Sequence, residues 1–573
     1  MKIKSYPVSP ASALTLEMHP VLKQILGNRG VTDNSECTLD LDGLASPGLI
    51  LNINHAVSLL RAALEQQDKI LVVGDFDADG ATSTALLLLC LRRFGFEQVD
   101  YLVPNRFEFG YGLTPEIVEV AKQRQPALII TVDNGIASID GVARATELGI
   151  KVLITDHHLP GTDLPAAECI INPNQFGCTF PSKALAGVGV VYYLMLALRA
   201  DLRDTGWFNI NNRSEPNMLQ YLDLVALGTV ADVVPLDKNN RCLVKHGVQL
   251  IRSGRCRPGI NALLEIAGQN KHNLNASDLG FVLGPRLNAA GRLDDMSLGI
   301  ECLLTENPHT AYLFAQQLND LNKDRKNIEQ SMQDQAMAFL SGLEDDAEKD
   351  TGLCLFNADW HQGVVGILAS RLKDKFHRPA IVFACSTENS NEIKGSARSI
   401  PGIHIRDLLD IIATKHPGLL SKFGGHAMAA GLSIYAKDFV AFKTAFNQEL
   451  ENLLDPHMLE QVIYTDGSLP ADCLTLQFAE LLEQAGPWGQ QFPEPLFIGD
   501  FEVLDQRVLG ARHLKLLLQA PASEQAIDAI AFNVSAEILG SKLSNLELLY
   551  RLQVNEFRGV RSVQLMIEEF IEA

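Results

Sequence analysis

Short apolar runs alternate with stretches of helical periodicity in the first part of the chain. From residue 51 the pattern predicts, in order, helix 53–66, strand 70–73, helix 81–94, strand 99–103, helix 115–124, strand 127–132, helix 137–148 and strand 151–155. Apolar strands separated by amphipathic helices are typical of a parallel, doubly wound α/β sheet. Because ligands of such sheets bind beyond the carboxyl ends of the strands, we expect the chemistry at that edge.

The pattern changes twice in the second part of the chain. From residue 308 to about 341, apolar side chains recur at steps of three, four or seven, which predicts one long helix of roughly 50 Å. After about residue 460, short strands separated by turn residues predict a small β-barrel. These changes divide the chain into an N-terminal extension (1–50), a catalytic α/β domain (51–307), a linker helix (308–350), a second α/β domain (351–455) and a barrel (456–573).

Composition and charge narrow the class of protein. A hydrophobic fraction of 47% over 573 residues is ordinary for a globular protein. The formal net charge of −21 argues against a protein that coats nucleic acid, so a polyanionic substrate must meet local basic patches or metal ions. Ten cysteines without a CxxC pair indicate neither a zinc site nor a disulfide framework. The N-terminus lacks the apolar core of a signal peptide, so we expect a cytoplasmic protein without membrane contact.

Three aspartates at alternate positions follow strand 70–73. In extended backbone, Asp75, Asp77 and Asp79 point to one side, and three crowded carboxylates repel one another unless a hard cation lies between them. A calcium EF-hand loop is the nearest competitor, but its twelfth position is Leu86 and an apolar strand precedes it. A solvated acidic turn stays open as the simpler interpretation. The pattern favours a divalent metal.

Further polar clusters follow other apolar segments. Asp133 comes after strand 127–132, the triplet Asp156–His157–His158 comes after strand 151–155, and Asp232 follows the apolar stretch 222–230. Singly, each aspartate could be a capping or turn residue. Together at one sheet edge, carboxylates and imidazole suit two Mn²⁺ or Mg²⁺ ions, since histidine favours manganese over magnesium.

Seven motifs in order carry a resemblance that covers nearly the whole chain beyond residue 50. They are GDFDADG (74–80), NRFEFGYGL (105–113), TVDNG (131–135), TDHH (155–158), GTVADVVPL (228–236), GPRLNAAGRL (284–293) and FGGHAMAAGL (423–432). The chain resembles the DHH phosphoesterase superfamily and, within it, bacterial single-strand-specific 5′→3′ exonucleases. The resemblance implies a DHH domain, a DHH-associated domain and a C-terminal OB-fold.

The resemblance also implies roles for the residues of the sheet edge. The implied ligands of two metals are Asp77, Asp79, Asp133, His157 and Asp232, with Asp133 as the bridging ligand. His158 would face the scissile phosphate, and Asp156 would orient the imidazoles. One departure is that Val73 stands where many members have a histidine, so Asp75 is the available substitute ligand.

Substrate contacts are expected from basic and small residues further along. Residues 241–300 carry eight basic against four acidic side chains, which favours a phosphate-facing surface over a merely solvated face. Glycine and alanine in GPRLNAAGRL and in FGGHAMAAGL allow a close backbone approach to a ligand. With the resemblance, the expected substrate-binding residues are Arg106, Arg286, Asn288, Arg292, Ser396, Arg398, Gly424, Gly425 and His426.

These observations predict a metal-dependent exonuclease that degrades single-stranded DNA from the 5′ end to nucleoside 5′-monophosphates in recombination and repair. The two-metal chemistry follows from the residues, whereas polarity and single-strand preference follow from the resemblance, as do single-strand-binding protein and a helicase as partners. Two alternatives stay open. A small-substrate DHH phosphodiesterase acting on nanoRNA or cyclic dinucleotides would not need the C-terminal barrel. A non-enzymatic single-strand-binding scaffold would not need intact acids in all four metal motifs.

Overall fold

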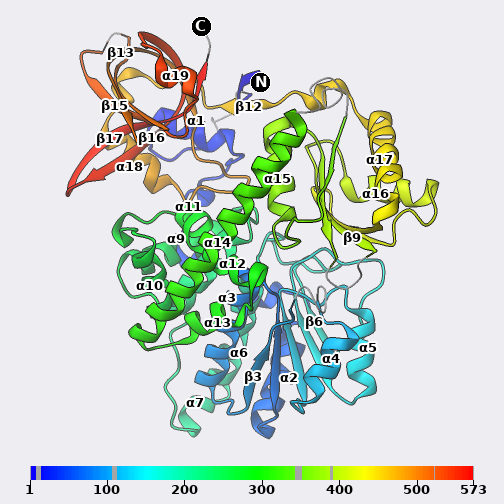
Figure 1. Ribbon diagram of the computed structural model, residues 1–573. Helices are drawn as coiled ribbons and strands as arrows, with labels where there is room; N and C mark the ends of the chain where they lie inside the picture. Colours follow the sequence, from blue (N-terminus) through cyan, green and yellow to red (C-terminus); the bar gives the residue numbers. More distant parts are fainter. Residues whose placement is uncertain are drawn as a thin grey trace.

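The computed structural model describes residues 2–7, 14–105, 112–341, 351–386, 391–510, 512–521 and 523–571. Figure 1 shows three regions: a parallel sheet with its helices at the bottom, a second α/β lobe at the upper right, and a barrel at the upper left. Among the described residues, no single helix is both long and apolar enough to cross a membrane, although Leu41–Leu49 and Ile53–Gln66 pass that test together as a pair bent by 81°.

The first sheet is parallel throughout and confirms the predicted fold class. Its order is β3 (Val99–Leu102), β2 (Ile70–Gly74), β4 (Leu128–Val132), β5 (Lys151–Thr155) and β6 (Cys169–Ile171). One face packs on α2 (Ile53–Gln66), α3 (Ala78–Phe94) and α6 (Gly187–Asp204), and the other on α4 (Pro115–Lys122) and α5 (Ile139–Glu147). Alternate side chains of each strand enter the two cores, which is why these strands are mostly apolar on both faces.

Helices follow this sheet. They are α7 (Trp207–Ile210), α8 (Leu222–Ala231), α9 (Lys238–Arg252), α10 (Pro258–Ile266), α11 (Ala276–Asp278), α12 (Gly284–Leu293), α13 (Ser297–Leu304) and α14 (Pro308–Ser341). The predicted long helix is confirmed as α14, which has 34 residues. Its N-terminal half packs on α10, α12 and α13, and its C-terminal half packs into a core of the second lobe.

The second lobe is a mixed sheet in the order β10 (Lys422–Gly425), β11 (Ala429–Tyr435), β9 (Glu392–Arg398), β8 (Ala380–Cys385) and β7 (Leu353–Phe356). Helices α16 (Ile405–Lys415) and α17 (Phe439–Leu453) contribute to the core on one face. Helix α15 (Val365–Phe376) and the end of α14 cover the other face.

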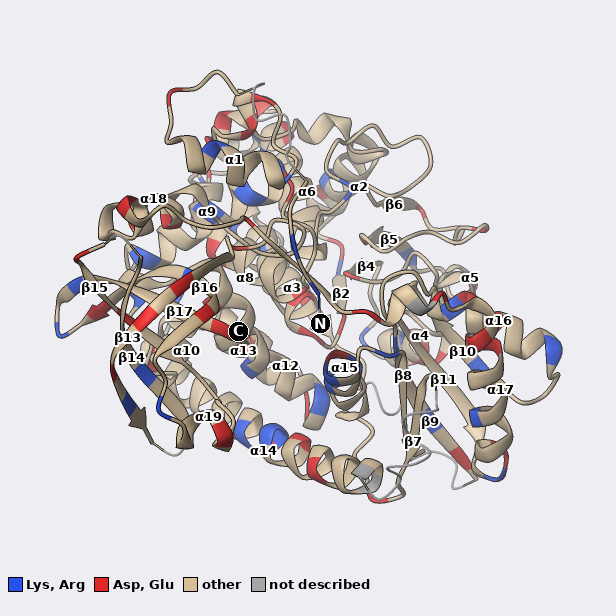
Figure 2. Ribbon diagram, turned by 90° about the horizontal axis from the view of Figure 1, so that it is seen from above, with Lys and Arg blue, Asp and Glu red and all other residues tan. Residues whose placement is uncertain are grey.

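The predicted barrel is confirmed as a closed five-stranded structure. Its order is β13 (Phe497–Leu509), β14 (His513–Gln519), β15 (Ala526–Ala531), β17 (Val560–Ile571) and β16 (Asn545–Phe557), with α18 (Leu476–Ala485) before it and α19 (Ala536–Gly540) between β15 and β16. Acidic and basic residues are interspersed over the barrel strands in Figure 2.

The N-terminal residues contact more than the first α/β region. Strand β1 (Lys2–Ser5) pairs in parallel with β12 (Val462–Thr465), which directly precedes the barrel region. Helix α1 (Pro20–Asn28) contributes to a core that also contains residues of α2, α3, α18 and the barrel. The two ends of the described chain are therefore packed together.

Candidate metal centre

The chain turns sharply from β2 into α3. Asp77 caps α3: its Oδ1 accepts hydrogen bonds from the backbone N–H groups of Asp79 and Gly80, both at 3.0 Å. A side chain at Gly80 would overlap the Asp75 backbone, so this turn requires glycine. The predicted extended backbone through all three aspartates is wrong, because Asp79 lies in the first turn of α3.

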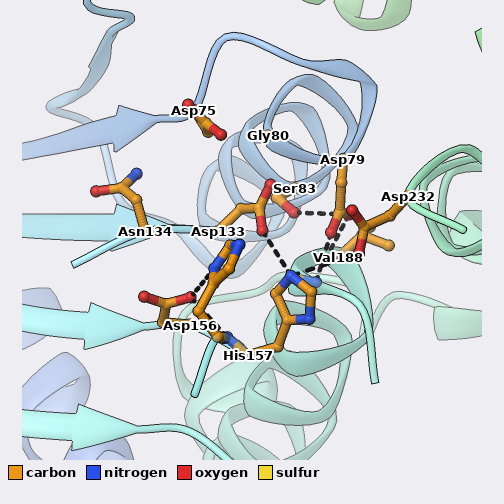
Figure 3. A network of polar contacts seen from close by, with 12 residues as sticks. Asp75, Asp79, Gly80, Ser83, Asp133, Asn134, Asp156, His157, Val188 and Asp232 are labelled. Atoms are coloured by element: carbon orange, nitrogen blue, oxygen red, sulfur yellow. Dashed lines mark hydrogen bonds and ion pairs between the residues drawn. The ribbon is translucent and has the colours of Figure 1, made fainter. Parts of the chain in front are cut away.

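The three aspartates of the turn belong to two neighbouring groups of potential ligands. Asp75 and Asp77 lie with Asp133, and ligand atoms of this group are within 4.8 Å of one another. Asp79 lies with His157 and Asp232 in a second group that meets the same limit. Figure 3 shows Asp79, Asp133, His157 and Asp232 pointing toward one another from separate elements.

His157 and Asp133 connect the two groups. His157 Nε2 lies 3.1 Å from Asp133 Oδ1 and 3.4 Å from Asp232 Oδ2. Asp133 and His157 follow β4 and β5, as predicted from the sheet, whereas Asp232 follows the end of helix α8. Asp232 therefore reaches the edge of the sheet because α8 packs there, and not because it follows a strand.

Glycines leave the space that these carboxylates occupy. A Cβ at Gly187 would lie 2.8 Å from Asp133 Oδ1, and a Cβ at Gly228 would lie 2.8 Å from Asp79 Oδ1. Gly187 also begins α6, and its N–H donates to Asp79 Oδ2 at 2.6 Å. Sequence reasoning missed both glycines, although glycine inside a helical pattern is a signal of close packing.

The electrostatics of the edge call for a cation. Burial and the charge of Asp77 raise the pKa of Asp79 to about 7. Burial and neighbouring carboxylates, first among them Asp79, also raise the pKa values of Asp133 and Asp232 well above the usual range. Burial and the nearby His158 lower the pKa of His157 to about 4, so its imidazole is neutral and can donate a lone pair.

The residues present fit two divalent ions. His157 Nε2 and Asp232 Oδ2 are buried and make no hydrogen bond within the described part of the chain. Carboxylates with one imidazole form a donor set that Mn²⁺ accepts readily, and the all-oxygen set of Asp75, Asp77 and Asp133 suits Mg²⁺ as well.

Asp156 and His158 form a separate pair beside the ligands. Asp156, which is 1% exposed, accepts from His158 Nδ1 at 2.7 Å and from the backbone N–H of Ile136 at 2.9 Å. Although burial opposes both shifts, this hydrogen bond and the charges lower the pKa of Asp156 and raise the pKa of His158. Asp156 thus orients one of the two imidazoles, that of His158.

We call the side of the first sheet that carries the potential metal ligands the metal edge. The second lobe reaches this metal edge through His426. Its ring stacks on that of His158 with a centroid separation of 6.3 Å and an interplanar angle of 17°. Gly425 has φ +147, and a side chain there would overlap Ala429, so it is required by the β10–β11 turn. Apart from its chain neighbours, no described residue lies within 4 Å of a Cβ at Gly424, which leaves room for a ligand.

A pocket of about 330 Å³ lies between the two lobes, next to the metal edge. It is lined by Phe76, Asp77, Asn288, Arg292, Gln362, Gly363, Val365, Gly366, Lys394, Gly395, Ser396, Arg398 and Gly431. Asp77 thus belongs both to the metal edge and to this pocket. Lys394 was missed from the sequence, although it alternates with Ser396 and Arg398 on one strand and so shares their face.

Helix α12 joins the pocket to the turn after β2. A Cβ at Gly291 would overlap the carbonyl oxygen of Phe76, so the helix lies directly against the turn. Asn288 Oδ1 accepts from the N–H of Ala78 at 2.8 Å, and Arg292 Nη1 donates to the carbonyl of Gly363 at 3.3 Å. Asn288 therefore lines the pocket and also holds the first turn of α3.

The structure does not bring every predicted substrate residue to this pocket. Arg286 is outside its lining and donates to Asn319 Oδ1 at 3.1 Å and to the carbonyl of Val282 at 2.6 Å. Arg106 lies outside the described residues.

The expected phosphate-facing surface of residues 241–300 is wrong for three of its arginines. Arg241 is 3% exposed and lies 4.1 Å from the centre of the Phe492 ring. Arg252 pairs with Glu483 at 2.7 Å, and Arg257 lies 3.7 Å from Asp223. These guanidinium groups have protein partners that the sequence pattern did not reveal: Arg252 links α9 to α18, and Arg241 packs on Phe492.

Family comparisons cover all three regions. Residues 69–229 match the DHH family, N-terminal domain; residues 349–452 match the DHHA1 domain; and residues 465–569 match the RecJ OB domain. The single-stranded-DNA-specific exonuclease RecJ of Escherichia coli K12 is 51% identical over 572 residues, which span 99% of this chain and 98% of that protein. The chain belongs to the RecJ family. RecJ of Salmonella typhimurium LT2 is 52% identical over 97% of this chain and 96% of the relative.

Solved RecJ structures share the arrangement of the lobes. RecJ from Thermus thermophilus in complex with Mn²⁺ matches with a TM-score of 0.79 and 27% identity, covering 100% of this chain and 79% of that one. The Mg²⁺ complex of the same protein matches with a TM-score of 0.74 and 26% identity, covering 100% and 78%. Both metals named for the RecJ relative are those that the donor set of this chain suits.

Proposed function

We propose that this RecJ-family chain is a single-stranded-DNA-specific exonuclease that uses two Mn²⁺ or Mg²⁺ ions, starts at the 5′ end and releases nucleoside 5′-monophosphates. The observation that carries the proposal is the position of Asp77, which lies both at the metal edge and in the lining of the basic pocket. A terminal phosphate held in that pocket places the next phosphodiester near the metal edge, so each cycle removes one nucleotide.

The pocket has the chemistry of a site for a terminal phosphate. Arg292, Lys394 and Arg398 supply positive charge, and Arg398 Nη1 donates to Ser396 Oγ at 3.0 Å. Charge-assisted hydrogen bonds to phosphate are among the strongest polar contacts in proteins. We assign the 5′-phosphate to this pocket because the family resemblance implies degradation from the 5′ end, and that end must then be bound beside the metal edge.

The residues of the metal edge then have distinct roles. The proposed ligands are Asp75, Asp77, Asp79, Asp133, His157 and Asp232, with Asp133 between the two ions. When bound, the ions supply charge neutralisation at the scissile phosphate and lower the pKa of the attacking water. Asp156 holds the Nδ1 proton of His158, so that His158 Nε2 donates to a phosphate oxygen, and His426 approaches the same phosphate from the second lobe.

The remaining regions extend the track for DNA. In this proposal residues 51–307 are the catalytic domain, 308–350 the linker, 351–455 the substrate-binding domain and 456–573 the single-strand-binding domain, with 1–50 as an N-terminal extension. Single-strand-binding protein and a helicase stay the predicted partners in recombination and repair. The comparisons support neither the small-substrate phosphodiesterase nor the inert scaffold.

End-labelled oligonucleotides test the proposal. With Mn²⁺, single strands labelled at the 5′ end should release labelled mononucleotide at once, whereas 3′-labelled strands should shorten progressively before the label is released. EDTA should stop both reactions, and blunt duplexes should resist. Rapid release of the 3′ label, or products longer than one nucleotide, would contradict the assignment.

A further inference from the structure

The side chain of Asn174 connects the segment that carries the metal ligand His157 to a second segment, around Lys183, that contacts the metal ligands. Its Nδ2 donates to the carbonyl of His157 at 2.6 Å and to the carbonyl of Lys183 at 3.2 Å. Its backbone N–H donates to Asn172 Oδ1 at 2.7 Å, and Asn172 Nδ2 donates to the carbonyl of His158 at 2.8 Å. Two asparagines after β6 therefore hold the backbone of both histidines.

Residues 182–188, which we call the positioning segment, include Lys183, the hydrogen-bond partner of Asn174. The segment ends at the metal edge. At its far end the N–H groups of Gly187 and Val188 donate to Asp79 at 2.6 and 2.9 Å. In its middle the backbone of Leu185 lies near the His157 ring and acts to raise its pKa. The positioning segment thus touches two of the three residues in the group of Asp79, His157 and Asp232.

Helix α9 anchors the positioning segment from the other side. Ser182 Oγ donates to Asp237 Oδ2 at 2.6 Å, and Asn240 Nδ2 donates to the carbonyl of Ala184 at 2.7 Å. Asn240 Nδ2 also donates to the carbonyl of Pro235 at 2.9 Å, three residues beyond Asp232. The positioning segment therefore hydrogen-bonds to Asp79 directly, and Asn240 links it to the chain just beyond Asp232. Asn174 is its direct link to the His157 backbone.

We propose that Asn174 is a positioning residue that sets the separation of His157 from Asp79 and, through it, the affinity of this group for its ion. The inference rests on the proposed two-metal function. Ligand atoms must be held within about 0.5 Å of productive geometry, and loss of outer hydrogen-bond partners of metal ligands typically costs ~10–100-fold in affinity. Removing the Asn174 amide frees the His157 backbone from the positioning segment.

Titration of the metal-free protein with Mn²⁺ by calorimetry tests the inference directly. The wild-type protein should bind two ions. In Asn174→Ala we expect one ion to bind ~10–100-fold more weakly and the other within about threefold of wild type. Exonuclease activity should need correspondingly more Mn²⁺, while kcat at saturating Mn²⁺ recovers most of its wild-type value.

Asn211 offers a matched control. It is exposed, and its Nδ2 donates to the carbonyl of Trp207 at 2.9 Å on α7. Asn211→Ala removes an equivalent bond away from the metal edge, so both Mn²⁺ affinities should stay unchanged. Asn174→Asp keeps the side-chain volume but loses the donor, and it replaces the alanine variant if that protein does not fold.

The outcomes separate the inference from the proposed function. Unchanged affinity for both ions in Asn174→Ala or Asn174→Asp overturns the positioning role, and so does equal weakening of both ions. If wild-type protein binds two ions, the variant loses one selectively, and yet wild type degrades no single-stranded DNA, the positioning role stands and the proposed function fails.

Discussion

At the scale of single residues, three aspartates of one short turn have three different environments. Asp77 caps α3, Asp79 accepts from the first N–H groups of α6, and Asp75 Oδ1 accepts from the N–H of Phe76 at 2.8 Å. Asp75 also lies in the oxygen-only group with Asp77 and Asp133. The turn interaction and the metal interaction of Asp75 therefore coexist, and substitution can separate them.

Asp75→Asn should raise the Mn²⁺ concentration for half-maximal activity by about tenfold, because the amide keeps the turn hydrogen bond but is a weaker ligand than a carboxylate. Thermal stability of the metal-free protein should change little. The measurement is activity against Mn²⁺ and Mg²⁺ in wild type and variant. An unchanged metal titration would leave Asp75 as a turn residue alone.

In the metal-free protein, the raised pKa of the buried Asp79 should make the free energy of unfolding depend on pH. The folded pKa of about 7 lies above the usual 3.8, so this carboxyl stabilises the fold at low pH and loses that contribution progressively as the pH rises from 3.8 to about 7. From pH 6 to 7.5 the loss is about 1 kcal/mol. His157 acts in the opposite direction, because its lowered pKa makes acid destabilising, so wild type alone does not reveal Asp79.

Comparison with Asp79→Asn measures the effect of this carboxyl, including its effect on the pKa values of Asp133 and Asp232. In EDTA, unfolding free energies from urea titrations should favour wild type over the variant by about 1 kcal/mol more at pH 6 than at pH 7.5. Saturating Mn²⁺ should remove this trend in the wild-type protein, since the ion displaces the proton. A pH-independent difference between the two proteins in EDTA would contradict the raised pKa.

The pocket arginines should distinguish phosphorylated from unphosphorylated ends. Arg398→Ala removes a cation from the pocket lining and should reduce the preference for a 5′-phosphate by about 2 kcal/mol, roughly thirtyfold in relative kcat/KM. Arg286→Ala is the matched control, because Arg286 contacts Asn319 and Val282 and lies outside the lining. A larger change of the ratio in the control than in Arg398→Ala would reverse the assignment.

At the scale of elements, α12 connects the turn after β2 to the pocket. Gly291→Ala places a methyl group on the carbonyl of Phe76 and should destabilise the fold by about 1–3 kcal/mol while raising KM for DNA, since Asn288 and Arg292 move with the helix. Gly540→Ala is the control, because no atom of the described residues, its chain neighbours and own helix aside, lies within 4 Å of a Cβ there. Equal melting temperatures and KM values for both variants would contradict close packing of α12.

Helices and strands with strong periodicity could be predicted from the sequence, but not the position of every metal ligand. Strands β2, β4 and β5 lie within a residue or two of their predicted ranges, because strands buried on both faces read as nearly continuous apolar runs. The convergence of Asp133 and His157 followed from the parallel order of those strands. Asp232 was singled out as a residue, but its position depends on α8 packing against α3 and α6.

Contacts between segments that are distant in sequence could not be predicted from local sequence patterns. The basic excess of residues 241–300 favoured a phosphate-facing surface because the partners of Arg241 and Arg257, Phe492 and Asp223, are not their neighbours in sequence. The link from Asn174 to Lys183 escaped notice for a related reason: hydrogen bonds to backbone carbonyls leave no pattern in the side chains of the partner. The tertiary structure therefore reveals a residue that positions the metal ligands, and it shows that part of the expected basic surface is engaged in contacts within the protein.

At the scale of the whole molecule, the barrel and the N-terminal residues share a core with the DHH region. Leu26 of α1, Leu60 of α2, Phe478 of α18 and Leu516 of the barrel belong to one buried cluster. Deleting residues 456–573 would expose this cluster and leave β1 without its partner β12. The barrel is thus part of the scaffold, and its contribution to DNA binding is better tested by point substitution than by truncation.

One ion pair joins the two ends of the chain. Arg29 donates to both carboxylate oxygens of Asp466 at 2.9 and 3.0 Å, and both side chains are 1% exposed. The same guanidinium donates to the carbonyls of Ile25 and Pro493 at 2.7 and 2.6 Å. Its carbon lies 5.2 Å from the centre of the Trp488 ring, so the side chain is enclosed on several sides.

Arg29→Ala should destabilise the protein by about 3–5 kcal/mol, because it leaves Asp466 buried without its counter-charge. The double variant Arg29→Ala with Asp466→Ala should recover part of this loss, since the uncompensated charge is gone. Arg144→Ala, which removes exposed ion pairs on α5, should leave the melting temperature nearly unchanged. Limited proteolysis of Arg29→Ala should first release fragments from residues 2–28 or from the segment around β12, because these lose their anchor. A double variant less stable than Arg29→Ala, or cleavage that begins in the second lobe, would show that the ends are held together by the apolar core and not by this pair.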